Sequence, residues 1–166
     1  MVRIKHISMD DPLYAQAISL RTAVLLEPIG LTIEDYLNLA PGREEQCEHF
    51  VAVVDHPDGE KVVGAATLFV DQTHPAPPRS KVRGKVQQVC VDKQRQGEGI
   101  GHKLMIAIEA RSFGELGLSS LYCHAQLAAM PFYDKLGWSV EGDEFEEAGI
   151  AHKQMCISAP KPIESP

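Results

Sequence analysis

The chain has 166 residues, of which 44% are hydrophobic and 23% are charged, and its formal net charge is −7 at pH 7. This length and composition predict one globular domain with a buried core, which we assign to residues 1–158, followed by a flexible tail over residues 159–166. The acidic balance argues against nucleic acid as a partner, because such binding needs Lys and Arg to neutralise phosphates.

Membrane contact and disulfide bonds are not expected either. No run approaches the ~18 consecutive apolar residues of a membrane span, and the opening MVRIKHISMDD turns acidic where a signal peptide would be apolar. We therefore expect a cytoplasmic protein. The cysteines, Cys47, Cys90, Cys123 and Cys156, form no CxxC pair. This favours reduced thiols over a disulfide framework or a metal site, and no metal is predicted.

The amino half opens with alternating apolar and polar residues. Residues 2–8 predict a strand, and residues 12–26 predict a helix that Pro28 ends. A second short helix is predicted over TIEDYLNL, with Thr32 as its N-cap and Asp35 three residues later. Together these segments predict a strand followed by two helices.

The middle of the chain is rich in β-branched residues. The runs over residues 49–55 and 61–71 flank HPDG and predict an antiparallel hairpin. The prolines of residues 72–80 predict a loop, and residues 82–92 predict a further strand. That strand leads directly into a cluster of glycines.

The carboxyl half continues the mixed pattern. Apolar residues recur at helical spacing from residue 100 to residue 108, and residues 118–125 alternate as a strand. A last helix over residues 128–136 ends at Gly137, and a strand pair around the AG dipeptide follows it. The chain is therefore predicted to be mixed α/β with mainly antiparallel strands.

Gly97, Gly99 and Gly101 alternate at the junction between a predicted strand and a predicted helix. Glycine admits positive φ and lets a ligand approach the main chain, and the first N–H groups of a helix attract phosphate. A P-loop is excluded because no GxxxxGK run with a following Ser or Thr occurs. A Rossmann site fits poorly, because the turn follows antiparallel strands, and a glycine connection without a ligand stays open.

The surrounding motifs resemble those of the GCN5-related N-acetyltransferase (GNAT) superfamily. The run QGEGIG, residues 96–101, matches its Gln/Arg-x-x-Gly-x-Gly/Ala signature and follows a V-x-V-D strand. The segment AAMPFYDKLGW resembles its second acetyl-CoA motif, and EEAGIAHKQM resembles the end of its ElaA-like branch. The resemblance implies a GNAT-type fold, with a sheet of about seven strands splayed at the acetyl-CoA site and about four flanking helices.

The resemblance also implies how acetyl-CoA, the cosubstrate, is bound. The strand edge at Val89, Cys90 and Val91 is expected to pair with the pantetheine arm. Gln126 stands where many GNAT enzymes carry an Asn that contacts this arm, and Gln at this place fits the ElaA-like pattern. The pyrophosphate is expected on the main chain of Gln96, Gly97, Glu98, Gly99, Ile100, Gly101 and His102.

Tyr133 occupies the family position of the acid that protonates the leaving thiolate. A phenol stays protonated at neutral pH and suits this role, although packing of the ring against the core is the alternative. The expected activity is N-acetyl transfer from acetyl-CoA to a primary amine, by direct attack through a tetrahedral intermediate. A module that binds acetyl-CoA without activity is the competing hypothesis.

The acceptor side is less defined by the sequence. His124, Glu144, Glu146 and His152 are candidates for the general base, since histidine titrates near neutral pH and carboxylates can act through water. Gln87 or Gln88 is a candidate to face the acceptor, whereas Cys90 and Cys123 are expected to be buried in strands rather than reactive. The acceptor is a small-molecule or peptide amine, and the resemblance is compatible with a homodimer.

Overall fold

The computed structural model describes residues 1–72 and 81–161, and these divide into two compact units. The first unit spans Met1–Phe69 and Val86–Ile108, and the second spans Val70–Lys85 and Glu109–Pro166. The predicted loop over residues 72–80 lies outside the described residues except for Gln72, as does the predicted tail beyond residue 161. The assignment of residues 1–158 to one domain stays a prediction.

The first unit contains an antiparallel sheet. β1 (Arg3–Ile7) pairs with β2 (Glu48–His56), and β2 pairs with β3 (Gly59–Asp71). The β-branched residues of β2 and β3 suit a buried pleated surface, and Gly59 supplies the positive φ of 115° at the turn between them. The predicted first strand and the predicted hairpin are confirmed.

Three helices precede this hairpin in the chain. α1 (Leu13–Arg21) continues through wider turns to a 3-10 turn over Glu27–Ile29, which contains Pro28. α2 (Ile33–Leu39) begins with the predicted cap: Asp35 N–H donates to Thr32 Oγ1 at 3.1 Å, and Thr32 N–H donates back to Asp35 Oδ2 at 2.9 Å. α3 (Arg43–Gln46) was not predicted, because a single turn shows no apolar periodicity.

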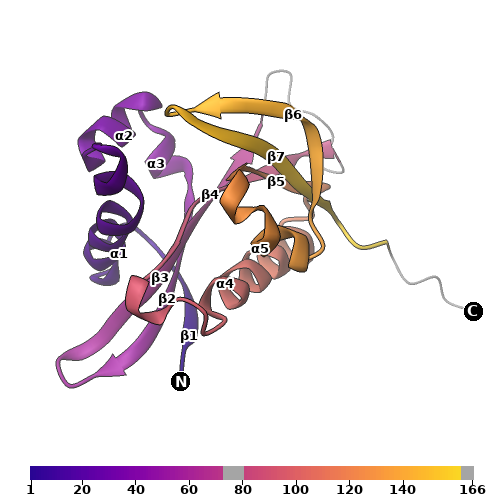
Figure 1. Ribbon diagram of the computed structural model, residues 1–166. Coiled ribbons are helices and arrows are strands. Elements are labelled where there is room, and N and C mark those ends of the chain that lie inside the picture. Colours follow the sequence, from indigo (N-terminus) through magenta and orange to yellow (C-terminus); the bar gives the residue numbers. More distant parts are fainter. Residues whose placement is uncertain (73–80, 162–166) are drawn as a thin grey trace, which may run out of the picture. The chain divides into compact units, whose positions relative to one another are not determined.

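The sheet of the first unit is covered on both faces (Figure 1). α1 packs on one face, where Leu13 and Ala17 join a core cluster that includes residues of β1, β2 and β3. On the other face, a Cβ added to Gly64 would lie 3.0 Å from side-chain atoms of Ile100 and Leu104 of α4 (Ile100–Glu109). Gly64 therefore lets α4 approach β3 closely.

The second unit is built around a second hairpin. β5 (Ser120–Gln126) pairs antiparallel with β7 (Ile150–Ser158), which pairs antiparallel with β6 (Ser139–Glu147). Ala148 and Gly149 form the turn between β6 and β7 with φ angles of 53° and 74°, so the predicted AG turn is confirmed. α5 (Met130–Lys135) follows β5, as predicted.

β4 (Arg83–Val91) belongs to both units. Its first three residues, Arg83 to Lys85, pair with β5 in parallel register, opposite Ser120 to Tyr122. The hydrogen-bonded strand order is β1-β2-β3-β4-β5-β7-β6. The predicted α/β class with seven mainly antiparallel strands is confirmed, and the described residues form five α-helices where about four were expected.

Candidate functional site

The turn after β4 is fixed at its start by two hydrogen bonds of Asp92. The Asp92 N–H donates to the Val63 carbonyl of β3 at 2.8 Å. Its carboxylate accepts from the Gln94 N–H at 3.0 Å, which caps a 3-10 turn over Lys93–Arg95. The chain therefore leaves the sheet in a defined direction immediately before the glycines.

The glycines themselves make an open turn at the start of α4. Gly97 and Gly99 have φ angles of 86° and 81°, which other residues rarely adopt. A Cβ added to either of them would meet no heavy atom within 4 Å, so the space beside this backbone is open. Both the conformation and the open space explain why glycine is needed at these two positions.

The N-terminal end of α4 offers hydrogen-bond donors to this space. The Lys103 N–H donates to the Gly99 carbonyl at 3.1 Å and makes the first bond of the helix. By helix geometry the N–H groups of Ile100, Gly101 and His102 have no acceptor within the helix and point out of its positive end. An open backbone turn with such donors fits the pyrophosphate of acetyl-CoA.

Gln96 and Glu98 support the turn through side chains. Gln96 Nε2 donates to the Val91 carbonyl at 3.3 Å and links the turn to the end of β4. Glu98 pairs with Arg95 at 3.3 Å on the exposed side, so this pair adds little to stability. The predicted binding residues from Val89 to His102 thus lie together in the first unit.

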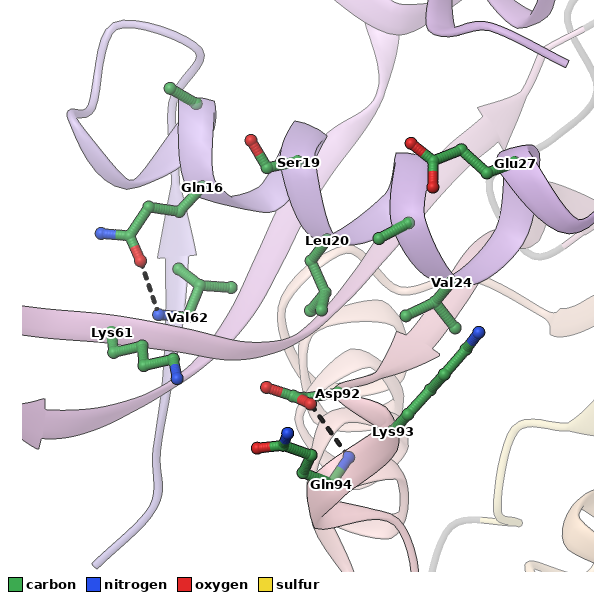
Figure 2. Close-up of a pocket in the computed structure, with 12 residues that line it drawn as sticks. Gln16, Ser19, Leu20, Val24, Glu27, Lys61, Val62, Asp92, Lys93 and Gln94 are labelled. Atoms are coloured by element: carbon green, nitrogen blue, oxygen red, sulfur yellow. Dashed lines mark hydrogen bonds between the residues drawn. The ribbon is translucent and has the colours of Figure 1, made fainter.

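A pocket of about 710 Å³ adjoins the start of this turn (Figure 2). Leu20 of α1 and Val24 of the wider turns after it contribute to an apolar wall, and the residues Asp92 to Gln94 contribute a polar wall. Figure 2 shows Leu20, of α1, and Val24, just after α1, directed toward Asp92 and Lys93. The pocket therefore combines apolar and polar contacts next to the predicted pyrophosphate turn.

The edge segment of β4 contains an unusual backbone conformation. Gln88 has a φ of 54°, although it is neither glycine nor part of a turn between strands. Its side chain does not project freely, because Oε1 accepts a 3.2 Å hydrogen bond from Arg21 Nε. Gln87 has a buried Oε1 that finds no hydrogen-bond partner among the described residues. The candidacy of either glutamine to face the acceptor stays a prediction.

The two strand cysteines are buried as predicted. Cys90 is 4% exposed and Cys123 is 2% exposed. Burial raises the pKa of each thiol to about 12. Neither side chain is a thiolate at neutral pH, which argues against a cysteine nucleophile.

Tyr133 lies in the second unit, within α5. Its side chain is only 7% exposed and packs against Phe132 and Trp138, with ring centroids 5.0 and 5.3 Å apart. Burial raises the pKa of its hydroxyl well above the ordinary value, and the neighbouring Cys123 raises that pKa further. The hydroxyl is therefore protonated at neutral pH, and its role as the acid stays a prediction.

Three of the remaining candidates lie close together in the second unit. His124 Nδ1 is 3.1 Å from Glu147 Oε1, and His152 Nε2 is 3.8 Å from Glu147 Oε2. Phe145 contacts both imidazole rings, with centroids 4.9 and 5.8 Å away. Gln126, at the end of β5, pairs with His152 in the strand register. Sequence reasoning named both histidines but missed Glu147 as the carboxylate between them.

The tautomers of the two histidines follow from their partners. His152 Nδ1 lies 2.7 Å from the Ile150 carbonyl, which can only accept, so Nδ1 carries the proton. His124 Nδ1 faces the Glu147 carboxylate and must likewise donate. In each ring Nδ1 is thus the nitrogen that donates. Glu144 and Glu146, the other base candidates, are exposed residues of β6.

A buried ionic group in the first unit had no signal in the sequence. Arg21 of α1 is 1% exposed and Glu44 of α3 is 6% exposed, and they form a two-point ion pair. Arg and Glu are ordinarily surface residues, and their spacing of 23 positions follows no local motif. Only the tertiary structure reveals that Arg21 also reaches Gln88 of β4.

The fold and the glycine turn define the class of protein that the motifs predicted, an acyltransferase that uses acetyl-CoA. A family model, the Acetyltransferase (GNAT) domain, matches residues 39–159. The chain therefore belongs to the GNAT acetyltransferase family, and the predicted resemblance is confirmed.

Similar proteins agree with this assignment. The chain is 35% identical over 113 residues to the protein named Uncharacterized N-acetyltransferase YjcF of Bacillus subtilis, which covers 68% of this chain and 71% of that protein. Among solved structures, Escherichia coli ElaA has a TM-score of 0.71 at 19% identity, covering 94% of this chain and 99% of ElaA. An aminoglycoside 6'-N-acetyltransferase complexed with coenzyme A has a TM-score of 0.71 at 14% identity, covering 96% and 99%. At these identities the two structures show a shared fold.

Within residues 1–72 and 81–161, no helix is long and apolar enough to cross a membrane. The cytoplasmic location and the homodimer stay predictions.

Proposed function

We propose that the protein transfers the acetyl group of acetyl-CoA to a primary amine by direct attack of the amine on the thioester. The observation that carries this proposal is the turn at Gly97 and Gly99, with open space beside its backbone and the N-terminus of α4 behind it. Such a turn binds a pyrophosphate by its main chain. It supplies the local anion site that a chain of net charge −7 needs.

The pantetheine arm has amides that can pair with a strand edge. We assign this role to Val89, Cys90 and Val91 of β4. β4 pairs with β5 only at Arg83 to Lys85, so this pairing does not use the backbone groups of Val89 to Val91. The pocket beside Leu20 and Val24 has the mixed character that suits the arm.

The chemical step needs two proton transfers. The amine nitrogen bonds to the thioester carbon, the carbonyl oxygen takes up negative charge, and the C–S bond then breaks. Tyr133 donates its hydroxyl proton to the leaving thiolate, and the attacking nitrogen loses a proton to a base. We assign the base to the histidines that adjoin Glu147, since Nδ1 of His124 and Nε2 of His152 both face its carboxylate.

The competing hypothesis is an inactive module that binds acetyl-CoA. One observation favours it: Tyr133 is only 7% exposed, and burial raises its pKa well above the ordinary value. For Tyr133 to act as an acid, its hydroxyl has to reach the thiolate sulfur. The family assignment and the open glycine turn support the enzyme, which remains our conclusion.

An acceptor screen tests the proposal. The full chain is incubated with acetyl-CoA and a panel of primary amines: a small amine, an amino acid, an aminoglycoside, a peptide N-terminus and a peptide lysine. Formation of coenzyme A and of the N-acetyl product is measured by mass spectrometry. We expect one class of amine to be acetylated. If acetyl-CoA raises the melting temperature but no amine is acetylated, the binding module replaces the enzyme.

A further inference from the structure

The guanidinium of Arg21 is the centre of a buried polar group in the first unit. Its two terminal nitrogens donate to the two carboxylate oxygens of Glu44, with the longer contact at 3.0 Å. Its Nε donates to Gln88 Oε1 at 3.2 Å, and its central carbon, Cζ, lies 5.5 Å from the centre of the Tyr36 ring. Tyr14 donates its hydroxyl to Glu44 at 3.1 Å. Arg21 is thus held from several sides and joins α1 and α3 to β4.

Burial makes this group costly unless every charge is paired. Arg21 and Glu44 are both almost fully buried, and their mutual hydrogen bonds offset the loss of solvation. Burial disfavours ionisation of Glu44, but the hydrogen bonds and charge of Arg21 outweigh it and lower the pKa of the carboxyl. A buried ion pair is often no more stabilising than apolar side chains of the same size. The other contacts of the Arg21–Glu44 pair therefore indicate a role besides stability.

The contact with Gln88 indicates this role. Gln88 has a φ of 54° within β4. A residue other than glycine keeps such a conformation only where its surroundings enforce it. Two side chains enforce it here: Arg21 holds the Gln88 amide, and the Thr67 hydroxyl donates to the Gln87 carbonyl at 3.1 Å.

The conformation at Gln88 affects the residues that follow. An irregular residue in a strand re-aims the backbone groups and side chains after it. Cys90, two residues later, is buried in the core cluster under α1. The Asp92 N–H is bonded to Val63. The segment from Val89 to Val91 is therefore fixed at its far end by packing and at its near end by Gln88.

We propose that Arg21, anchored by Glu44, is a positioning residue that holds Gln88 in its left-handed conformation and so fixes the strand edge at Val89 to Val91 for acetyl-CoA. The proposal rests on the proposed function, because that function assigns the pantetheine arm to this edge. Arg21 does not touch the coenzyme in this role. It acts through Gln88.

The first test changes Gln88, whose replacement leaves the buried ion pair intact. Gln88→Asn keeps an amide and a residue type that tolerates positive φ, but the shorter side chain cannot reach Arg21 Nε. Gln88→Glu is the matched control, because it keeps an acceptor oxygen at the original distance. Arg21→Lys is the second variant: it keeps the charge for Glu44 and loses the Nε donor.

Two measurements are made on the full chain. Amide hydrogen exchange compares the segment from Val86 to Asp92 with β2, and calorimetry gives the dissociation constant of acetyl-CoA. We expect Gln88→Asn and Arg21→Lys to speed exchange in the β4 segment about tenfold and to weaken acetyl-CoA binding 5- to 30-fold, which corresponds to about 1–2 kcal/mol. The double variant should bind acetyl-CoA no more weakly than the weaker-binding single variant, because both substitutions remove the same interaction. Gln88→Glu should stay within threefold of wild type.

Three outcomes would overturn the proposal. Unchanged acetyl-CoA affinity in both Gln88→Asn and Arg21→Lys would show that the contact does not position the edge. Faster exchange spread equally over β2 and β4 would assign Arg21 to general stability. Equal losses in Gln88→Asn and Gln88→Glu would remove the role of the Arg21 contact. If wild-type protein binds no acetyl-CoA, the proposed function fails instead, and the exchange rates still decide whether Arg21 holds β4.

Discussion

Replacement of Gly99 by alanine separates the binding role of the glycine turn from its structural role. Gly99 has a φ of 81°, and an L-residue in this region costs about 1–2 kcal/mol. The added Cβ meets no heavy atom within 4 Å, so the free protein has no packing cost to add. For a chain of this size, 1 kcal/mol corresponds to roughly 2–4 °C in melting temperature. Gly99→Ala should therefore fold and melt about 2–8 °C below wild type.

The effect on coenzyme binding should be larger than the effect on folding. The Cβ of Gly99→Ala would stand in the open space beside the turn, where we place the pyrophosphate. Acetyl-CoA at a concentration of about 100 times its dissociation constant stabilises a protein by ~2.7 kcal/mol. This should raise the melting temperature of wild type by roughly 5–11 °C. We expect Gly99→Ala to lose most of this rise at the same acetyl-CoA concentration.

Thermal melting with and without acetyl-CoA measures both effects in one experiment. Gly117→Ala is the matched control, because Gly117 has a φ of 65°, also has no heavy atom within 4 Å of an added Cβ, and lies in the other unit. It should lower the melting temperature by a similar amount and keep the full rise with acetyl-CoA. A full rise in Gly99→Ala would refute the assignment of the pyrophosphate to this turn.

Four further outcomes are expected. Tyr133→Phe should lower kcat about 10²–10⁴-fold with acetyl-CoA binding kept, as steady-state kinetics and calorimetry would show; a wild-type rate would contradict the acid assignment. His152→Gln should lower kcat with acetyl-CoA binding kept, and a wild-type kcat would exclude His152 as base. Gly64→Ala should cost about 1–3 kcal/mol in denaturant unfolding, since its Cβ would meet α4; unchanged stability would contradict the close approach. Glu44 has a lowered folded-state pKa, so its contribution is complete above the ordinary carboxyl pKa and is lost as pH falls through the lowered value. Urea unfolding should show this loss of stability in wild type. The same loss in Glu44→Gln would show that another group causes it.

Local patterns allowed much of the fold to be predicted. Alternation and β-branched runs identified the strands, and the Thr32 cap and the turn at Ala148 and Gly149 appeared where neighbouring residues specify them. The glycine turn was also predictable, because a positive φ at Gly97 and Gly99 is a local requirement. The single turn of α3 was missed, since four residues carry no periodicity. Features that neighbouring residues determine can be read from one sequence.

The polar groups of the site depend instead on residues far apart in the chain. Arg21 meets Gln88 across 67 positions, and His124 meets Glu147 across 23. No spacing rule joins such pairs, and an acidic run such as that of β6 is ordinarily a solvated surface. The residue type alone was therefore enough to name the histidines as candidate bases. Glu147 could be recognised as the carboxylate between them only once the pairing of β6 with β7 was known.

The turn and the helix behind it are positioned by two consecutive residues of β3. The Val63 carbonyl accepts the Asp92 N–H at 2.8 Å, which fixes the point where the chain leaves β4. Gly64 has no side chain, and Ile100 and Leu104 of α4 approach the position that its Cβ would take to within 3.0 Å. The two ends of the glycine turn are thus tied to adjacent positions of one strand. A glycine inside a β-branched run lowers strand propensity, and here that cost allows α4 to direct its N-terminus at the proposed pyrophosphate site.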